Sequence, residues 1–327
     1  MSQASHWEKK LGRWVARIFS PPGKRGKLVV FCYHQVLEAT DPLRPGEPTL
    51  EEFEADIDRI AAWFNVLSLP DAAKAMRNGT LPPRAACITF DDGYLNNHSL
   101  AAPALEARNL PATFFITSGA VEQGVMWNDL IIDAVAACDG LPDLAALREH
   151  APEVSTTMSP QQIAQGIIDN IKYLPLDVRW EMAEQFYKDN AGAELPRKMM
   201  QPAHVADLAA RGFDVGAHTV SHPILAKLDS EGARQEIEES VRWVAGVIGK
   251  QPLSFAYPNG RPNVDFQAEH AGQARDAGCE VAVTTEWAVS AGRVDAYHIP
   301  RVGPWWRFGR NGLDGLMRIY VKSLLPS

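Results

Sequence analysis

The feature that most constrains the fold is an alternation of short apolar runs with longer amphipathic stretches along most of the chain. The apolar runs have the length and composition of buried strands and lie at residues 28–33, 66–69, 85–90, 112–117, 213–217, 253–256, 281–284 and 297–299. Helical periodicity occurs between them at residues 50–63, 97–108, 230–248 and 266–277. Strands that alternate with helices form parallel sheets, so the sequence predicts either a (β/α) barrel or a doubly wound open sheet.

Residues 121–202 interrupt this alternation, because they show helical patterns and no convincing strand. The patterns lie at residues 126–137, 159–173 and 177–189. We therefore expect a helical insertion after the fourth strand, near the mouth of a barrel. Trp127 in the insertion either stacks on a substrate ring or anchors the insertion to the barrel. The predicted parts are a basic amphipathic helix at 1–27, the barrel at 28–120 and 203–302, the insertion at 121–202, and a basic and aromatic segment at 303–327.

Positive charge is concentrated at the two ends of a chain whose net charge is −8. Residues 1–27 hold seven lysines and arginines against one glutamate. Such a helix either lies on an anionic membrane surface or packs on the barrel. The acidic central body argues against nucleic-acid binding. Apolar side chains at helical spacing accompany the basic residues in both end segments: Trp7, Leu11, Trp14, Val15 and Ile18, and then Trp305, Trp306, Phe308, Leu313, Leu316, Met317, Ile319 and Tyr320.

The cysteines and the start of the chain indicate a compartment. Cys32, Cys87, Cys138 and Cys279 lack paired or metal-type spacing, so we expect them to be reduced, which favours a reducing compartment. Residues 1–27 lack the apolar core of a secretion signal, and no apolar run reaches the roughly 18 residues of a spanning helix. The expectation is a cytoplasmic protein, either free or peripheral to the inner face of the cell membrane. No protein partner is indicated.

Two adjacent carboxylates, Asp91 and Asp92, follow the apolar run at residues 85–90, with Gly93 behind them. Side by side they repel each other. A fold that keeps both therefore supplies a cation or gives the two groups different roles, one as an ionised ligand and one as a proton acceptor. The plainer interpretation is an Asp-Asp-Gly turn between a strand and a helix.

A second constellation, His218 and His222, follows the run at residues 213–217. Imidazoles four positions apart converge on a metal from one face of a helical turn, or from a strand end that curls into a helix start with Pro223 at its first position. Together with Asp92 they form a two-histidine, one-carboxylate set that leaves a position open for water, the pattern of a catalytic zinc site. The alternative is two histidines that hydrogen bond to the backbone.

The candidate polar residues share one position relative to the strands. Each follows a strand-like run, as expected at the carboxyl ends of barrel strands, where barrel enzymes gather their chemistry. They are His34, Asp91, Asp92, His218, Tyr257 and Arg301.

The sequence resembles the polysaccharide deacetylase family, carbohydrate esterase family four, over most of residues 28–302. The resemblance is carried by Thr-Phe-Asp-Asp-Gly at 89–93, His-Thr-Val-Ser-His-Pro at 218–223, Pro103, Ala-Thr-Phe-Phe at 112–115, and Phe-Ala-Tyr-Pro-Asn-Gly at 255–260. It implies an α/β fold, a distorted (β/α)7–8 barrel of deacetylase type, and metal-dependent removal of acetyl groups from N-acetylated sugars.

The resemblance also implies roles for individual residues. Asp91 corresponds to the general base, and Asp92, His218 and His222 correspond to the ligands of a divalent metal, for which we predict Zn²⁺. The N–H of Asn259 corresponds to a donor for the oxyanion; the alternative is a Pro-Asn-Gly turn at 258–260.

The sequence departs from the common family pattern in three places. Ala256 stands where an arginine usually partners the base, and Arg301 is the predicted replacement, unless it is a surface or membrane-facing residue. The usual Asp-Asp-Trp motif is not recognisable near residues 284–287, and the C-terminal Leu-x-His that supplies the general acid is missing.

His34 is the predicted general acid. Tyr-His-Gln-Val at 33–36 resembles the Tyr-His-x-Val opening of a family subset with circularly permuted motifs. The first and last strands of a closed barrel are neighbours. A histidine on the first strand can therefore reach the same place as the usual histidine on the last strand. His34 is otherwise a histidine that closes a strand by hydrogen bonding, and His298 is a weaker candidate for the acid.

The predicted function is a metal-dependent hydrolase that removes an N-acetyl group from an amino sugar in a polysaccharide, oligosaccharide or lipid-linked glycan. Two enzymatic alternatives are an O-acetyl esterase and a non-sugar amidohydrolase on the same site. A glycan-binding protein that has lost turnover is the non-enzymatic alternative, and the intact base Asp91 argues against it.

Overall fold

The computed structural model describes residues 6–138, 142–155, 157–192, 194–292, 295–303 and 312–322. Its strands form one eight-stranded sheet with the order β7-β6-β5-β4-β3-β1-β8, to which β2 adds by pairing with β3. All pairings are parallel except that of β1 with β8. The strands are β1 (Lys27–Tyr33), β2 (Asn65–Val66), β3 (Ala85–Phe90), β4 (Thr113–Ile116), β5 (Asp214–Ala217), β6 (Ser254–Ala256), β7 (Val281–Val283) and β8 (Ser290–Ala291).

The sheet curls into a distorted barrel that residues 299–302 close. Ile299 bridges Val283 of β7, and Val302 bridges Phe31 of β1. Backbone hydrogen bonds support the second contact, with the Cys32 N–H donating to the Val302 carbonyl at 3.0 Å. The predicted distorted barrel is confirmed. The strand expected at 297–299 is absent among the described residues, because this segment makes single bridges on either side rather than a continuous ladder.

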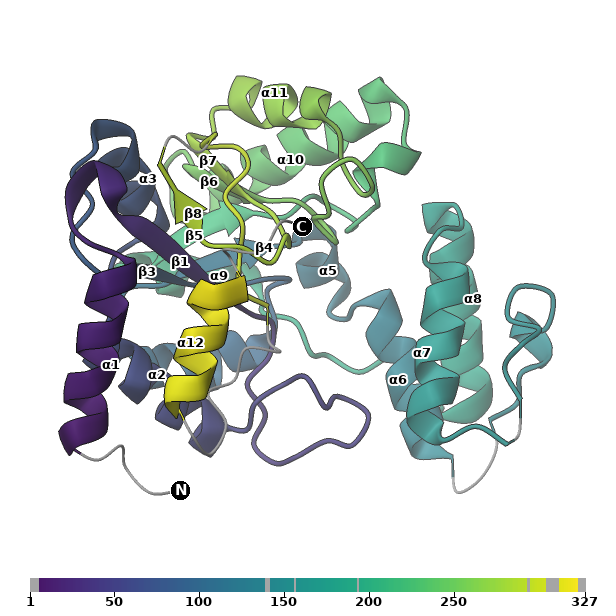
Figure 1. Ribbon diagram of the computed structural model, residues 1–327. Coiled ribbons are helices and arrows are strands. Elements are labelled where there is room, and N and C mark those ends of the chain that lie inside the picture. Colours follow the sequence, from purple (N-terminus) through teal and green to yellow (C-terminus); the bar gives the residue numbers. More distant parts are fainter. Residues whose placement is uncertain are drawn as a thin grey trace.

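Helices cover the outer face of the sheet (Figure 1). A π-helical turn at Asn97–Ala101 precedes α4. The helices are α1 (His6–Phe19), α2 (Leu50–Trp63), α3 (Leu69–Asn78), α4 (Ala102–Glu106), α5 (Ser118–Gln123), α6 (Trp127–Ala137), α7 (Pro160–Ile171), α8 (Leu176–Asn190), α9 (Pro202–Ala210), α10 (Ser230–Ile248), α11 (Ala268–Asp276) and α12 (Gly312–Lys322).

Local capping explains where several elements begin. A capping box between Thr49 and Glu52 starts α2, which has the predicted bounds. The Ser68 side chain accepts a hydrogen bond from the Asp71 N–H at 3.3 Å and starts α3 at Leu69. The strand expected at 66–69 therefore ends at Val66, and α3 is a helix that the hydrophobic pattern did not predict.

Alternation along the strands separates two buried layers. On β1, Val29 and Phe31 belong to the hydrophobic core beneath the helices, whereas Leu28 and Val30 belong to a second cluster with residues of β3, β4, β6 and β7. On β3 the residues beneath the helices include Ile88. This alternation directs Cys32, Thr89 and Asp91 to the barrel interior at the carboxyl ends of their strands.

The helices α6, α7 and α8 stand beside the barrel as a separate lobe (Figure 1). Their buried side chains form a hydrophobic cluster distinct from that of the barrel, with Ile131, Ile167 and Phe186 fully buried. Trp127 belongs to this cluster and is 8% exposed. The lobe thus has its own core and meets the barrel at the end where the strands terminate.

The terminal helices α1 and α12 lie side by side on the barrel (Figure 1), where the rings of Phe19 and Tyr320 stack at 5.2 Å. Gly12 faces the Trp63 ring of α2 so closely that an added Cβ would lie 2.3 Å from it. Most of the apolar stripe of α1 faces outward, with Trp7 62% and Trp14 63% exposed, while Val15 packs against the core. The helix α1 itself packs on the barrel through Gly12 and Ala16, as one of the two sequence alternatives has it, while its tryptophans face away from the barrel.

Two further observations concern the chain ends. Within the described ranges, none of the helices combines the length and apolar character that a bilayer-spanning segment needs. Trp305, Trp306 and Phe308, which the sequence grouped with α12, lie outside the described residues.

Candidate active site

The adjacent carboxylates at the end of β3 point to different partners. Asp91 continues the inward alternation of the strand and meets Arg301. Asp92 adopts a left-handed backbone conformation, with φ +74°, and Gly93 follows with φ +92°. A non-glycine residue in this region carries backbone strain, which is common at functional sites. The turn thus separates two like charges that an extended chain would hold side by side.

Asp91 forms a two-pronged ion pair with Arg301. Each Asp91 oxygen accepts a hydrogen bond from a different Arg301 nitrogen at 2.7 Å, and both residues are buried. Arg301 also donates to the Thr284 carbonyl at 2.9 Å. Burial alone would raise the pKa of Asp91, but Arg301 and then His218 outweigh it and hold that pKa below its usual range. Arg301 therefore lies beside Asp91, in the place predicted for it. The arginine that usually occupies this place in the family is replaced by Ala256 in this sequence.

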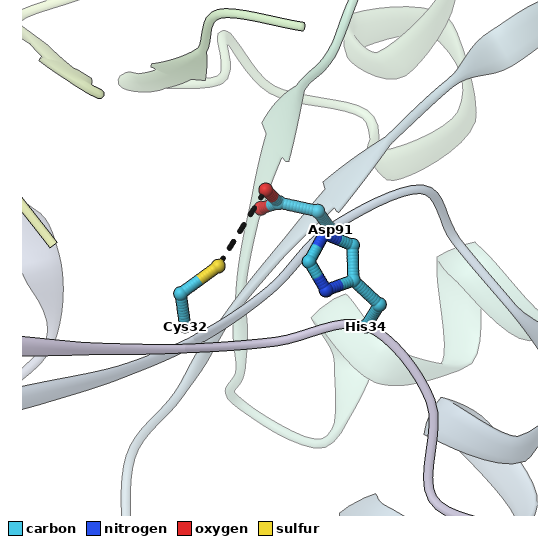
Figure 2. A group of neighbouring side chains, drawn as sticks. All are labelled: Cys32, His34 and Asp91. Carbon is cyan, nitrogen blue, oxygen red and sulfur yellow. Dashed lines mark hydrogen bonds between the residues drawn. The ribbon is translucent and has the colours of Figure 1, made fainter. Parts of the chain in front are cut away.

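Cys32 completes the surroundings of Asp91, and Figure 2 shows it with His34 and Asp91. The Cys32 sulfur lies 3.8 Å from Asp91 Oδ2, and ligand atoms of the three residues lie within 4.8 Å of one another. Arg301 already uses both oxygens of Asp91, and burial raises the pKa of the Cys32 thiol, which keeps it protonated. This group is therefore a poor metal site.

Asp92, His218 and His222 form a second group with the spacing of metal ligands. Asp92 Oδ1 lies 3.5 Å from His218 Nε2 and 3.6 Å from His222 Nε2. Ligand atoms of a tetrahedral site with bonds of roughly 2.0–2.1 Å are separated by about 3.3 Å. Asp92 Oδ1 is buried and has no hydrogen-bond partner in the described part of the chain. An orphaned carboxylate oxygen that faces two imidazole nitrogens fits a bound cation.

The protonation states of the two histidines also suit a bound cation. His218 Nδ1 lies 2.7 Å from the Ala256 carbonyl, which only accepts, so Nδ1 carries the proton and Nε2 offers its lone pair. Burial, His218 and Arg179 lower the pKa of His222 well below its usual value, which keeps that imidazole neutral. Burial raises the pKa of Asp92; a bound divalent cation would oppose that shift.

The two histidines converge from a loop rather than from a helix. His218 follows β5 directly, and the chain passes through Thr219 and His222 with positive φ values of 64° and 53°. Pro223 lies outside any helix, so its predicted place at a helix start is wrong. Glu236 of α10 holds the loop between the two histidines in place. Its Oε2 accepts hydrogen bonds from the Val220 and Ser221 N–H groups at 2.8 and 2.9 Å.

A cavity of about 280 Å³ opens over these groups. His34 lies in its wall; burial lowers the pKa of His34, but the carboxylates of Asp92, Glu47 and Asp91 outweigh burial and raise it. His298 instead packs against Phe266 and is absent from the cavity wall. The cavity is lined by His34, Asp91, Asp92, Met126, Trp127, Asn128, Ile168, Lys172, Arg179, His218, His222, Asn259 and Thr285.

Asn259 lies in the same wall in a left-handed conformation, with φ +57°. Thr285 Oγ1 donates a hydrogen bond to its carbonyl. Its N–H has no hydrogen-bond partner among the residues that the structure describes. The Pro-Asn-Gly turn and the predicted oxyanion donor are therefore compatible, because the turn leaves this N–H available.

The insertion supplies a wall that the sequence motifs did not predict. Asn128 of α6, Ile168 of α7 and Arg179 of α8 all line the cavity. Cys32 was also missed as a neighbour of the base. The signal available in the sequence is its spacing of two from His34, which directly follows β1, because alternate residues of an extended segment lie on the same face. Arg179 has no comparable signal.

Solved structures with the same fold include several deacetylases. Streptococcus pyogenes deacetylase PplD in complex with acetate is 15% identical with a TM-score of 0.59, covering 92% of this chain and 100% of that chain. IcaB from Ammonifex degensii is 20% identical with a TM-score of 0.56, covering 94% and 99%. The BpsB deacetylase domain from Bordetella bronchiseptica is 17% identical with a TM-score of 0.51, covering 86% and 97%. At these identities the similarity concerns the fold.

No curated protein matches the sequence. The sequence model of the family described as polysaccharide deacetylase matches residues 78–282, more than half of the 327 residues. The matched region contains the Asp91–Asp92 pair, both histidines of the proposed metal site, and Asn259. The chain therefore belongs to the polysaccharide deacetylase family, and the protein is an enzyme of carbohydrate deacetylation.

Proposed function

We propose that the protein is a zinc-dependent N-deacetylase that hydrolyses the acetamido group of an amino sugar in a polysaccharide, oligosaccharide or lipid-linked glycan. The observation that carries the proposal is the buried, unpaired Oδ1 of Asp92 facing His218 and His222. A neighbouring carboxylate, Asp91, is held by Arg301 instead. Because the two adjacent acids have different partners, Asp92 suits the role of metal ligand and Asp91 that of general base.

The residues divide the chemistry among themselves. A divalent cation held by Asp92, His218 and His222 would polarise the acetyl carbonyl and lower the pKa of a water molecule. Asp91 accepts the proton of the attacking water, and Arg301 keeps its carboxylate ionised and oriented. The Asn259 N–H donates to the oxygen that gains negative charge. His34, in the same wall, donates a proton to the departing amine.

The need for that last proton favours an amide over an ester. An amine leaves poorly until its nitrogen is protonated, so amide hydrolysis requires a general acid as well as a base. His34 and Asp91 line one cavity and their ligand atoms lie within 4.8 Å. A binding protein without turnover would have no use for the buried Asp91–Arg301 pair at this place.

Acetate release tests the proposal directly. N-acetylglucosamine oligosaccharides and acetylated xylan are incubated with the protein, with and without chelator, and the chelated protein is then supplied with Zn²⁺. We expect acetate from the N-acetylated glycan only, loss of activity with chelator and recovery with Zn²⁺. Release from xylan alone would favour the O-acetyl esterase. Glycan binding without acetate release from either substrate would favour the inactive binding protein.

We also propose that α1 and α12 attach the protein to an anionic membrane surface, at the inner face of the cell membrane. Among the described residues, six of the eight exposed large hydrophobic side chains lie on these two helices. Lys9, Lys10, Arg13 and Arg17 are exposed on α1 beside the apolar stripe. Apolar side chains flanked by basic ones suit the interface of an anionic bilayer. The six side chains are Trp7, Leu11, Trp14, Ile18, Met317 and Val321.

Substitution of Trp7 and Trp14 by glutamine tests this attachment without unfolding α1, whose packing face contains Gly12. We expect the native protein to sediment with vesicles containing phosphatidylserine, and the double variant to bind them about 10-fold or more weakly. Raised salt should weaken the native binding. Tyr173→Gln, at a 48% exposed aromatic on the insertion side, is the control and should bind normally. Equal sedimentation of all three proteins would contradict the proposal.

A further inference from the structure

Arg179 of α8 is a buried cation that forms no ion pair with a carboxylate of the described residues. Of the described arginines, two are buried: Arg301 at 1% exposure, paired with Asp91, and Arg179 at 4%. Arg179 Nη2 donates to the Ser221 carbonyl at 3.1 Å, and Nη1 lies 3.5 Å from the Lys172 carbonyl. Its Nε has no hydrogen-bond partner within the described residues. Its hydrogen-bond partners among the described residues are thus neutral carbonyl groups.

Glu236 is the acid that acts on Arg179, and its carboxylate already accepts other hydrogen bonds. Glu236 opposes the effect of burial on the Arg179 guanidinium, yet the pKa of Arg179 falls to about 10. The carboxylate of Glu236 accepts hydrogen bonds from the Val220 N–H and from the N–H and hydroxyl of Ser221. A buried charge without a directly paired counter-charge is costly, so the fold maintains a cation that Glu236 compensates only in part next to the catalytic cavity.

Arg179 lies in the wall between two cavities. It lines the catalytic cavity and also a neighbouring cavity of about 300 Å³. Its guanidinium carbon lies 4.7 Å from the centre of the Trp127 ring, which lines both cavities as well. Trp180 adds a second aromatic side chain to the neighbouring cavity. Aromatic rings and a few polar groups are the usual lining of a ligand site. Asp177, also in this wall, is exposed.

We propose that this neighbouring cavity is a subsite for an anionic group of the glycan, a phosphate or a carboxylate next to the sugar that is deacetylated. The inference rests on the proposed function. A guanidinium binds such groups through paired N–H donors, and the Arg179 side chain borders both this cavity and the catalytic one. The anion would pair directly with a guanidinium whose hydrogen bonds to described residues go to neutral carbonyl groups. The preferred substrate is then a negatively charged glycan rather than a neutral polymer of N-acetylglucosamine.

Substrate selectivity tests the subsite. Acetate release is measured for a neutral N-acetylglucosamine oligosaccharide, the same oligosaccharide with a phosphate at its reducing end, and one carrying a glucuronic acid unit. We expect native kcat/KM to favour one charged substrate, which identifies the anion. Arg179→Gln removes the positive charge and should lower kcat/KM for that substrate about 10- to 100-fold more than it lowers kcat/KM for the neutral one.

The controls separate recognition from positioning. Arg179→Lys retains the charge and should recover part of the selectivity. Arg234→Gln, at an exposed arginine outside both cavities, should leave all rates unchanged. An equal loss for neutral and charged substrates in Arg179→Gln would mean that Arg179 only holds the loop at Ser221. That result, or a native enzyme without preference for either anion, would overturn the proposal.

A binding measurement keeps the subsite separate from the proposed function. Calorimetric titration with N-acetylglucosamine 1-phosphate, glucuronic acid and N-acetylglucosamine requires no turnover. We expect a charged ligand to bind the native protein about 10-fold or more tightly than Arg179→Gln. If no glycan is deacetylated but this difference persists, the deacetylase proposal fails and the anion site stands. If acetate is released and neither selectivity nor binding depends on Arg179, the anion site fails alone.

Discussion

Replacement of Asp91 by asparagine is expected to lower kcat by about 10²–10⁴-fold while the metal content stays unchanged. Asparagine keeps the shape of the side chain but does not accept a proton at neutral pH. Asp91 is not in the group of Asp92, His218 and His222, whose ligand atoms converge, so the cation should remain. Acetate release and metal analysis on the same samples measure both quantities.

The variant also leaves Arg301 without its counter-charge in a buried site, which we expect to cost about 3–5 kcal/mol of stability. A double variant, Asp91→Asn with Arg301→Met, removes both charges and should recover much of the melting temperature without recovering activity. Asp214→Asn is the matched control. Asp214 accepts hydrogen bonds from Thr113 and Ser254 at the opposite end of the strands, so its substitution should leave kcat nearly unchanged. Substantial activity in folded Asp91→Asn would rule out Asp91 as the base.

Substitution of His222 by asparagine is expected to weaken metal binding by about 100-fold or more, because even the loss of a group that supports a ligand costs about 10- to 100-fold. Asparagine tolerates the left-handed backbone at this position, where φ is +53°, so the loop should keep its shape. Activity at limiting Zn²⁺ should be lost and should return in part at high Zn²⁺. Inductively coupled plasma measurements on dialysed protein give the stoichiometry.

Two comparisons sharpen the metal experiment. His218→Ala should also lose the cation, but it removes the hydrogen bond to the Ala256 carbonyl as well, and a fall in melting temperature should accompany it. His150→Ala, at an exposed histidine in the insertion, should retain both metal and activity. Full zinc occupancy in His222→Asn after dialysis would show that His222 is not a ligand.

Local signals predicted the fold class and several element bounds. Strand β3 and helices α2 and α10 have the predicted bounds because a continuous apolar run and complete caps mark them; Asp229 caps α10 at its start and Gly249, with φ +71°, ends it. Strand β8 (Ser290–Ala291) was not predicted, because a two-residue strand is stabilised by its pairing with β1 rather than by its own composition. The prediction of a carbohydrate deacetylase is confirmed by the family match over residues 78–282.

The sequence by itself determined an alternating α/β fold and the motif residues at its strand ends, because periodicity and motif spacing are local properties. Periodicity left a barrel and an open sheet as alternatives, and the family resemblance implied the barrel. The sequence left Arg301 open between a surface residue and the partner of Asp91, since these residues are 210 positions apart. Only the tertiary structure decided that pairing, through the segment that closes the barrel. It alone brought Arg179 from the insertion to the catalytic cavity, because a buried charge is defined by what surrounds it in space.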